Sequence, residues 1–282
     1  MKMKMDKESR YSVLMSVYGR ERPEYLRAAL NSIMEQTLAA DEIVLVCDGP
    51  LGAELEGVIA EFKEQLQLLR LPENAGLGSA LAQGLKLCRN EWVARMDSDD
   101  IAAAGRCGLQ MAFLQNHSEV DVLSGTVAEF QGDALTEEDA IKQTASYKTL
   151  PQTHEELSVY LKDRNPVNHP CVMFRKSRAL AAGGYQPCSL FEDYDLWIRM
   201  YQHGCVFANL SDVLLYMRVN GMHQRRGGLR YAGSIVRFRT KMLRAGLLSP
   251  ARYVYTTAAR VAVSLLPAGV RRRIYDIKLR KH

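Results

Sequence analysis

The fold of this chain is decided by one stretch, Asn90-Glu91-Trp92-Val93-Ala94-Arg95-Met96-Asp97-Ser98-Asp99-Asp100-Ile101. Its apolar run from Trp92 to Met96 is typical of a strand, and the run ends in three carboxylates within four residues. Residues two apart in an extended segment point the same way. Asp97 and Asp99 are therefore expected on one face, where each raises the pKa of the other unless a cation lies between them. Oxygen ligands select a hard cation such as Mg²⁺ or Mn²⁺, and the alternative is a solvated acidic turn.

Strands and helices alternate around this stretch. Apolar runs predict strands and one-face apolar periodicity predicts helices, in the order strand 11–18, helix 23–36, strand 43–47, helix 52–65, strand 68–71 and helix 77–85. This alternation predicts an α/β fold with a mostly parallel central sheet and helices on both faces. Asp48 follows the strand at 43–47, so Asp48 and Asp97 are expected on the edge of the sheet where ligands bind in such folds.

The second half of the chain has a less regular pattern. Another helix is predicted to end at Gly204. Its first turn contains Glu192, Asp193 and Asp195, and helices favour negative charge at this position. From Arg230 onward the pattern is helical and basic. The other expected elements are a helix at 105–116, a strand at 120–130, a loop at 131–147, a strand at 166–175, and two short strands at 206–207 and 213–219.

The composition indicates a globular chain that works under reducing conditions. Its 282 residues can bury a substantial core. The six cysteines include no Cys-x-x-Cys pair and are interpreted as reduced thiols of a cytoplasmic protein. No small-residue cleavage site follows the basic N-terminus, and no apolar run approaches the roughly 20 residues that span a bilayer. Nothing in the sequence indicates an oligomeric state.

Charge is distributed unequally along the chain. Residues 218–282 contain 16 lysines and arginines and one acid, Asp276, whereas residues 1–217 contain 21 basic and 31 acidic residues. This division predicts a body at 1–217 and a basic, mainly helical extension at 218–282. A basic amphipathic extension suits the anionic inner leaflet of a membrane, and the alternative is a helical pair that completes the fold. Nucleic acid is disfavoured because no aromatic interleaving accompanies the charge.

The order and spacing of these motifs resemble the inverting family 2 glycosyltransferases of the GT-A fold. The resemblance covers about residues 10 to 230 and implies a GT-A catalytic domain at 1–217. Two segments, 216–219 and 222–228, are similar to the bacterial exopolysaccharide and O-antigen branch of the amylovoran type. The residues that carry the family resemblance are Asp48-Gly49, Asn74, Gly76, Arg95 to Asp100, and Glu192-Asp193.

The resemblance implies roles at the strand ends. Asp48 would contact the base of a nucleotide-sugar donor, and Asn74 and Gly76 would contribute to the same nucleotide site. Asp97 and Asp99 match the Asp-x-Asp motif of the family. Asp97 would face the ribose and Asp99 the divalent metal, Mn²⁺ or Mg²⁺, with Asp97 as a second candidate ligand.

Further roles fall on residues outside that motif. Asp193, with Glu192 beside it, matches the catalytic base of the family, and the alternative is that both acids only favour the start of a helix. Arg95 would hold the nucleotide or the carboxylates, or form a structural ion pair. His169 either lines the acceptor side or is structural. A basic loop is expected to close over the diphosphate or to be merely solvated, and it contains His223, Arg225 and Arg226.

These roles imply the metal-dependent, inverting transfer of a hexosyl or N-acetylhexosaminyl group from a nucleotide-sugar, with UDP as the expected nucleotide. The expected acceptor is a lipid-linked glycan of a cell-surface polysaccharide, reached from the cytoplasmic side of the membrane. The segment 224–227 lacks the tryptophan of the processive members' Gln-x-x-Arg-Trp motif, which favours the addition of one sugar. Two alternatives stay open: a metal-dependent phosphohydrolase and a non-catalytic nucleotide-binding module.

Overall fold

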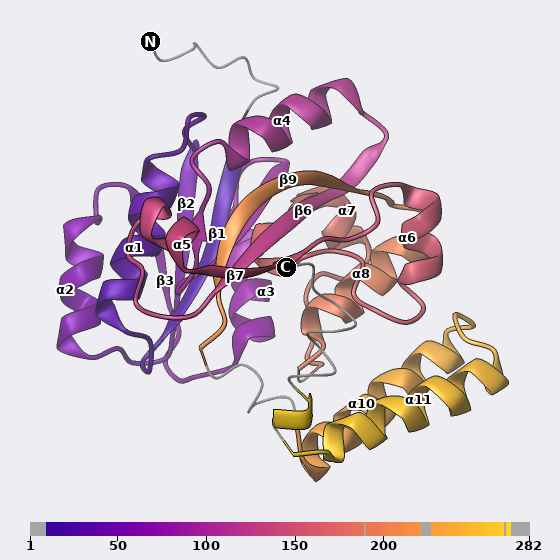
Figure 1. Cartoon of the computed structure of the whole chain (residues 1–282). Helices are drawn as coiled ribbons and strands as arrows, with labels where there is room; N and C mark the ends of the chain where they lie inside the picture. The colour runs from indigo at the N-terminus through magenta and orange to yellow at the C-terminus, as the bar shows by residue number, and fades with distance from the viewer. Residues whose placement is uncertain (1–9, 189, 221–226, 268, 272–282) are drawn as a thin grey trace.

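The computed structural model describes residues 10–188, 190–220, 227–267 and 269–271. Within these ranges the strands form a nine-stranded sheet with helices on both faces, and a C-terminal helical hairpin lies beside it (Figure 1). The strands are β1 (Tyr11–Tyr18), β2 (Glu42–Asp48), β3 (Leu66–Arg70), β4 (Trp92–Asp97), β5 (Ile101–Ala102), β6 (Val120–Phe130), β7 (Thr144–Lys148), β8 (Met173–Arg175) and β9 (Val206–Arg218). The helices are α1 (Pro23–Met34), α2 (Ala53–Glu61), α3 (Leu77–Leu87), α4 (Arg106–Asn116), α5 (Glu137–Gln143), α6 (His154–Tyr160), α7 (Lys176–Ala181), α8 (Glu192–Gln202), α10 (Leu229–Arg244) and α11 (Pro250–Leu265), with a 3₁₀ helix at His169–Cys171.

The sheet has a parallel half and a mixed half. Its order is β3-β2-β1-β4-β8-β6-β9-β5, and β7 pairs with β6 outside this path. Strands β3, β2, β1 and β4 are parallel, β8 runs antiparallel to both β4 and β6, and β6 is parallel to β9. The predicted α/β fold class is confirmed. The elements predicted in the first half are also confirmed, although α2 ends at Glu61 rather than at residue 65.

Two apolar layers cover the sheet because side chains alternate along its strands. In β1, Val13, Met15 and Val17 join the cluster that contains buried residues of α1, α2 and α4. Leu14 joins the opposite cluster, which contains buried residues of α3, α7 and α8. Helix α3 approaches the sheet closely at Gly84, where a Cβ atom would come within 2.6 Å of side-chain atoms of Leu14 and Val46.

Replacing Gly84 with alanine is expected to lower the free energy of unfolding by about 1–3 kcal/mol, because the added methyl group overpacks a buried contact. The matched control is Gly57→Ala in α2, where a Cβ atom would have no heavy atom within 4 Å. That change is expected to raise stability by up to about 1 kcal/mol through helix propensity. Chemical denaturation of both variants measures the difference, and equal effects at both sites would contradict the close approach of α3.

The prediction of a loop at 131–147 was wrong. This segment contains α5 and most of β7. Thr136 caps α5, since its Oγ1 accepts the N–H of Asp139 at 3.2 Å, and three acids lie in the first turn of the helix. β7 then pairs with β6 in antiparallel orientation. The acidic residues that obscured any apolar periodicity are therefore the ones that favour the start of this helix.

Two strand predictions were wrong in extent. Of the segment 166–175, only β8 is a strand, because Pro170 has no N–H for a ladder and lies in the 3₁₀ helix. The two strands expected at 206–207 and 213–219 are one strand, β9. Register shifts between β6 and β9 around Gly125 and Thr126 accommodate the polar residues between the two apolar runs.

The C-terminal hairpin of α10 and α11 packs on α8 and on the segment after α6. Ile235, Phe238 and Met242 of α10 join Tyr194 and Ile198 of α8 in one buried cluster. Ion pairs reinforce this contact: Lys241 pairs with the buried Asp195 and Arg252 pairs with Asp163. In the described part of the chain, no helix has the length and apolar character needed to cross a membrane.

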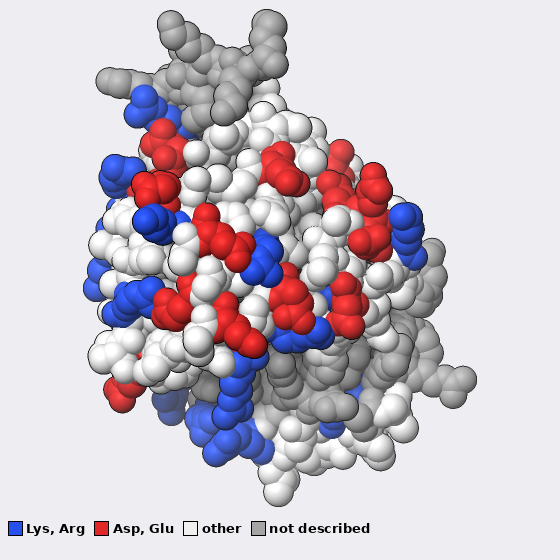
Figure 2. All heavy atoms as spheres, turned by 90° about the vertical axis from the view of Figure 1, so that its left-hand side faces the viewer, with Lys and Arg blue, Asp and Glu red and all other residues white. Residues whose placement is uncertain are grey.

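The opposite side of the molecule carries both signs of charge. Figure 2 shows this side, the left-hand side of Figure 1, with acidic and basic side chains interleaved. Its elements include α1, α2 and β3, which contribute the exposed ion pairs Arg27–Glu61 and Arg70–Glu56. Exposed pairs of this kind add little stability.

Candidate active site

The site begins at the carboxyl ends of the parallel strands. Strand β1 lies between β2 and β4, and its residues Tyr18 and Ser16 are in register with Asp48 and Asp97, respectively. The prediction that Asp48 and Asp97 lie on one edge of the sheet is therefore confirmed. This edge is where ligands bind in open α/β sheets.

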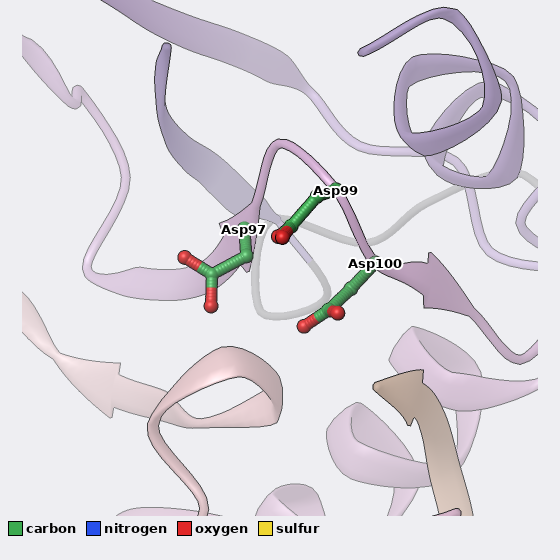
Figure 3. A group of neighbouring side chains, drawn as sticks. All are labelled: Asp97, Asp99 and Asp100. Atoms are coloured by element: carbon green, nitrogen blue, oxygen red, sulfur yellow. The ribbon is translucent and has the colours of Figure 1, made fainter. Parts of the chain in front are cut away.

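Three carboxylates project from the turn between β4 and β5. Figure 3 shows Asp97, Asp99 and Asp100 close together at this turn, and one ligand oxygen from each lies within 4.8 Å of the others. Burial raises the pKa of Asp99 to about 7, and the charges of Asp97 and Glu21 add to the effect. Burial, followed by the charges of Asp99 and Asp97, raises the pKa of Asp100 well above its usual value.

These carboxylates fit a divalent cation. All the donors are oxygen atoms, which suits Mg²⁺ or Mn²⁺. Oδ1 of Asp100 accepts the backbone N–H of Arg218 at 2.8 Å, whereas its buried Oδ2 has no hydrogen-bond partner among the described residues. A buried oxygen without a donor is costly, and a bound cation would compensate both for that cost and for the repulsion between the carboxylates.

Two buried arginines hold the acidic turn. Arg95 in β4 donates to Asp97, and although burial works against its charge, Asp97 together with Tyr185 and Asp100 raises the pKa of Arg95. Arg218 at the end of β9 donates from Nε to the carbonyl oxygen of Asp99 at 2.9 Å and stacks 3.7 Å from the ring centre of Tyr25. The turn is therefore fixed from both halves of the sheet.

The raised pKa of Asp99 predicts a pH-dependent stability in the metal-free protein. Between pH 3.8 and about 7 the folded state binds more protons than the unfolded state at this group, so the free energy of unfolding falls as pH rises. Asp99→Asn removes this decrease in the free energy of unfolding, because asparagine does not titrate. The variant is expected to gain thermal stability over the unmodified protein as pH rises from about 4 to about 7, and to keep the gain above pH 7.

The measurement is a series of melting curves in EDTA across this pH range. Ser32→Ala serves as the control because Ser32 Oγ accepts the N–H of Ala102 next to the acidic turn and does not titrate. A difference in melting temperature between Asp99→Asn and the unmodified protein that stayed constant with pH would contradict the raised pKa.

Asp48 organises the loop that precedes α3. Its carboxylate accepts hydrogen bonds from the backbone N–H of Ala75 at 2.7 Å and of Gly76 at 3.1 Å. Its carbonyl oxygen accepts a hydrogen bond from Nδ2 of Asn74 at 3.2 Å. Gly76 has φ +85°, which favours glycine, and Gly49 packs so closely on Asn74 that a Cβ would lie 2.7 Å from its backbone nitrogen. The predicted nucleotide residues Asp48, Asn74 and Gly76 thus form one connected unit.

Glu192 and Asp193 form the first turn of α8, and both are half-buried. Asn165 donates from Nδ2 to Oδ2 of Asp193 at 2.7 Å, which fixes the orientation of that carboxylate. Burial raises the pKa of Glu192, and the charge of Asp193 adds to this effect. Glu192 also lies against the start of α3, where a Cβ on Gly78 would be 3.0 Å from its own Cβ.

A buried tyrosine connects the two acidic groups. Burial raises the pKa of Tyr185; Arg95 opposes the shift, and the charges of Asp193, Asp97 and Glu192 add to it. The charges of Asp193, Asp97 and Glu192 thus all act on one buried hydroxyl, and on this ground we treat the acidic turn and the first turn of α8 as one candidate site. His169 Nε2 lies 2.9 Å from this hydroxyl, and burial followed by the charge of Arg95 lowers the histidine pKa well below its usual value. His169 is thus a neutral residue that positions Tyr185.

Not every predicted site residue can be placed. Three predicted residues, His223, Arg225 and Arg226, lie outside the described residues. The sequence analysis also missed several residues of the site. One of them is Asp100, which stands directly beside the predicted ligands Asp97 and Asp99. Asn165 and Tyr185 come from distant segments and carry no local pattern, whereas Arg218 lies in the segment 216–219 that carries the resemblance but was given no role.

Comparisons with known proteins identify the family of this chain. The family model for Glycosyl transferase family 2 matches residues 12–182. An uncharacterised glycosyltransferase of Haemophilus influenzae is 39% identical over 96% of this chain and 100% of its own length. The amylovoran biosynthesis glycosyltransferase AmsE of Erwinia amylovora is 36% identical over 94% of this chain and 98% of its own. The UDP-Gal:alpha-D-GlcNAc-diphosphoundecaprenol beta-1,3-galactosyltransferase of Escherichia coli is 34% identical over 98% of both chains.

Solved structures share the fold at low sequence identity. TarS residues 1–349 of S. aureus, crystallised with UDP-GlcNAc, align with a TM-score of 0.65 and 19% identity over 95% of this chain and 76% of that chain. The mannosyltransferase PcManGT of Pyrobaculum calidifontis, in complex with GDP-Man and Mn²⁺, aligns with a TM-score of 0.62 and 19% identity over 95% of this chain and 79% of that chain.

Proposed function

Because this chain belongs to glycosyltransferase family 2, and is a glycosyltransferase of the GT-A fold, we propose that it transfers one sugar from a UDP-sugar to a lipid-linked glycan acceptor with inversion of configuration. The acceptor would be an intermediate of a bacterial cell-surface polysaccharide. Residues 1–217 would form the transferase domain and residues 218–282 an extension of it. The relatives found are glycosyltransferases, and none favours a phosphohydrolase.

One observation supports the proposal above all others. Acids from two distant segments, Asp97 at the end of β4 and Asp193 at the start of α8, act through their charges on the same buried hydroxyl of Tyr185, and Asp99 lies beside Asp97. A displacement reaction at a sugar carbon needs a group that stabilises the departing diphosphate and a base that deprotonates the attacking hydroxyl. The two acidic groups offer these functions in one site.

The donor would bind along the carboxyl ends of β2 and β4. The unit of Asp48, Asn74 and Gly76 would receive the base, and Asp97 the ribose. Asp99, with Asp97 and Asp100 beside it, would hold Mn²⁺ or Mg²⁺. When bound, such a cation neutralises charge that develops on the diphosphate leaving group. Arg95 holds the carboxylate of Asp97 in position for this purpose, because its own buried guanidinium donates to that carboxylate.

Asp193 would accept the proton of the acceptor hydroxyl. The hydrogen bond from Asn165 fixes the rotamer of its carboxylate, so no rotamer search is needed when the acceptor arrives. Glu192 would stay beside Asp193 as its neighbour in the first turn of α8. His169, held neutral by burial, would keep Tyr185 in place between the two acidic groups.

Two relatives support the polysaccharide and lipid parts of the proposal. AmsE is named for amylovoran biosynthesis, and the E. coli relative is named for transfer of galactose from UDP-Gal to GlcNAc-diphosphoundecaprenol. A diphosphoundecaprenol acceptor is anchored in a membrane. We therefore place this chain in the cytoplasm, peripheral on the inner face of the membrane, where the basic extension would meet anionic lipid.

Nucleotide preference can be tested by thermal shift with UDP-, GDP- and CMP-sugars, each with and without Mn²⁺. UDP-sugars with Mn²⁺ are expected to raise the melting temperature by about 5–10 °C at a hundredfold excess over Kd, since a ligand at that excess contributes about 2.7 kcal/mol. Asp99→Asn is expected to lose the metal-dependent part of this shift. A larger shift with GDP- or CMP-sugars would reject UDP, and the absence of any shift would reject the donor site.

The base assignment can be tested with Asp193→Asn. This change is expected to lower kcat about 10²–10⁴-fold, because a general base contributes that much, while the thermal shift with UDP-sugar and Mn²⁺ is retained. Glu192→Gln is the matched control on the neighbouring residue and is expected to keep most of the activity. Unchanged transfer by Asp193→Asn would remove Asp193 from the role, and loss of transfer only in Glu192→Gln would move the role to Glu192.

A further inference from the structure

The outward face of α11 is apolar along its whole length. The exposed side chains of this helix repeat at three- and four-residue spacing, and none of them is charged. Val254 is 63% exposed and Tyr255 is 76% exposed. Together with neighbouring alanines they line a shallow surface groove, whose residues are Pro250, Ala251, Val254, Tyr255, Ala258, Ala259 and Ala262. Leu265 continues this face at the end of the helix and is 50% exposed.

The arginines of α11 point elsewhere, since they hold the helix on the body. Arg252 pairs with the carboxylate of Asp163, and Arg260 donates to the carbonyl oxygen of the same residue. The exposed apolar face of α11 is therefore not exposed because the helix has detached from the body. It is a continuous apolar surface on a helix that is already anchored.

The partner helix of the hairpin adds positive charge. Arg230, Arg237 and Arg244 repeat every seven residues on α10, so they lie along one side of that helix, and all three are exposed. Among the residues that the structure describes, no carboxylate lies within ion-pair distance of them. We define the bilayer-facing surface as the exposed apolar residues of α11 together with these three arginines.

We propose that this surface docks on an anionic lipid bilayer, with the apolar side chains of α11 entering the interface and the α10 arginines contacting lipid phosphates. An amphipathic helix with an apolar face and adjacent basic residues binds in this way, and each arginine near an anionic leaflet adds attraction. The inference deepens the proposed function and rests on its lipid-linked acceptor, because it names the residues that would bring the enzyme to that acceptor.

A second copy of the chain fits this surface less well. A twofold contact through α11 would place the same patch of both copies together, and with it the two basic extensions, each of which carries 16 lysines and arginines and one acid. Like charges across an interface oppose association, whereas an anionic leaflet neutralises them. Charge complementarity therefore selects the bilayer.

The hairpin that carries the bilayer-facing surface packs directly against the first turn of α8. Phe238 of α10 stacks on Phe191 with ring centres 4.6 Å apart and planes 2° from parallel, and Phe191 directly precedes Glu192 and Asp193. Lys241 of α10 pairs with Asp195 in the same turn of α8. A bilayer that holds the hairpin would thus hold the helix that carries the proposed base, close to where a lipid-linked acceptor emerges.

The test is flotation of the full chain with vesicles of about 70:30 phosphatidylcholine and phosphatidylglycerol, without donor or acceptor. Val254→Asp combined with Tyr255→Asp is expected to weaken binding about tenfold or more, because two apolar side chains no longer enter the interface. Val159→Asp is the matched control on α6, since Val159 is 60% exposed but lies outside the hairpin. It is expected to bind within about twofold of the unmodified chain.

Charge is tested separately by replacing Arg230, Arg237 and Arg244 with glutamate. These variants are expected to lose affinity for the anionic vesicles and to lose most of the decrease in binding that the unmodified chain shows between about 0.1 and 0.5 M salt. Melting curves and the thermal shift with UDP-sugar and Mn²⁺ confirm that each variant is folded. Since neither substituted region touches the donor site, the shift is expected to be unchanged.

Three outcomes would overturn the inference. These are equal vesicle binding by the α11 variant and the Val159→Asp control, equal binding to anionic vesicles and to pure phosphatidylcholine, and a dimer in light scattering that the α11 variant dissociates. The last would assign the surface to a second copy. A retained UDP-sugar shift without vesicle binding rejects only this inference, whereas vesicle binding without any nucleotide shift rejects only the proposed function.

Discussion

The structure depends on how it holds the negative charge of the turn between β4 and β5. Burial and mutual repulsion raise the pKa of both Asp99 and Asp100, so positive charge nearby stabilises the ionised turn. Arg95 supplies it from the parallel half of the sheet, and Arg218 fixes the backbone of the turn from β9, more than 100 residues later in the chain. Both halves of the sheet are therefore needed to build one acidic turn.

Helix α8 carries the second group of acids in the candidate site. Trp197 of α8 is buried in the apolar layer that also contains Leu14 of β1, which sets the helix against the sheet. Its first turn then presents Glu192 and Asp193 next to Tyr185, and its other side receives α10. One helix thus belongs to the core, to the proposed catalytic site and to the contact with the extension.

The sequence predicted the parallel half well because its signals are local. Apolar runs that end in Asp48 and Asp97 define strands and strand ends, and parallel pairing then requires these ends to share an edge. The rest depends on contacts between distant residues. No local pattern links Asn165 to Asp193, and the capped helix at 137–143 is so acidic that its polarity conceals it. The site could be located from sequence, but its supporting residues could not.

The uneven distribution of charge along the chain gives the molecule an electrostatic asymmetry. Residues 1–217 carry a net charge of −10 and residues 218–282 a net charge of +15, so an anionic surface repels the first part and attracts the second. The extension packs on α8, next to the first turn that holds Asp193. An approach steered by this charge asymmetry would bring that end of the site toward the anionic surface, and the mixed-charge side shown in Figure 2 would not face that surface. Orientation would thus follow from electrostatics before any specific contact forms, and the apolar face of α11 would then determine whether the encounter lasts.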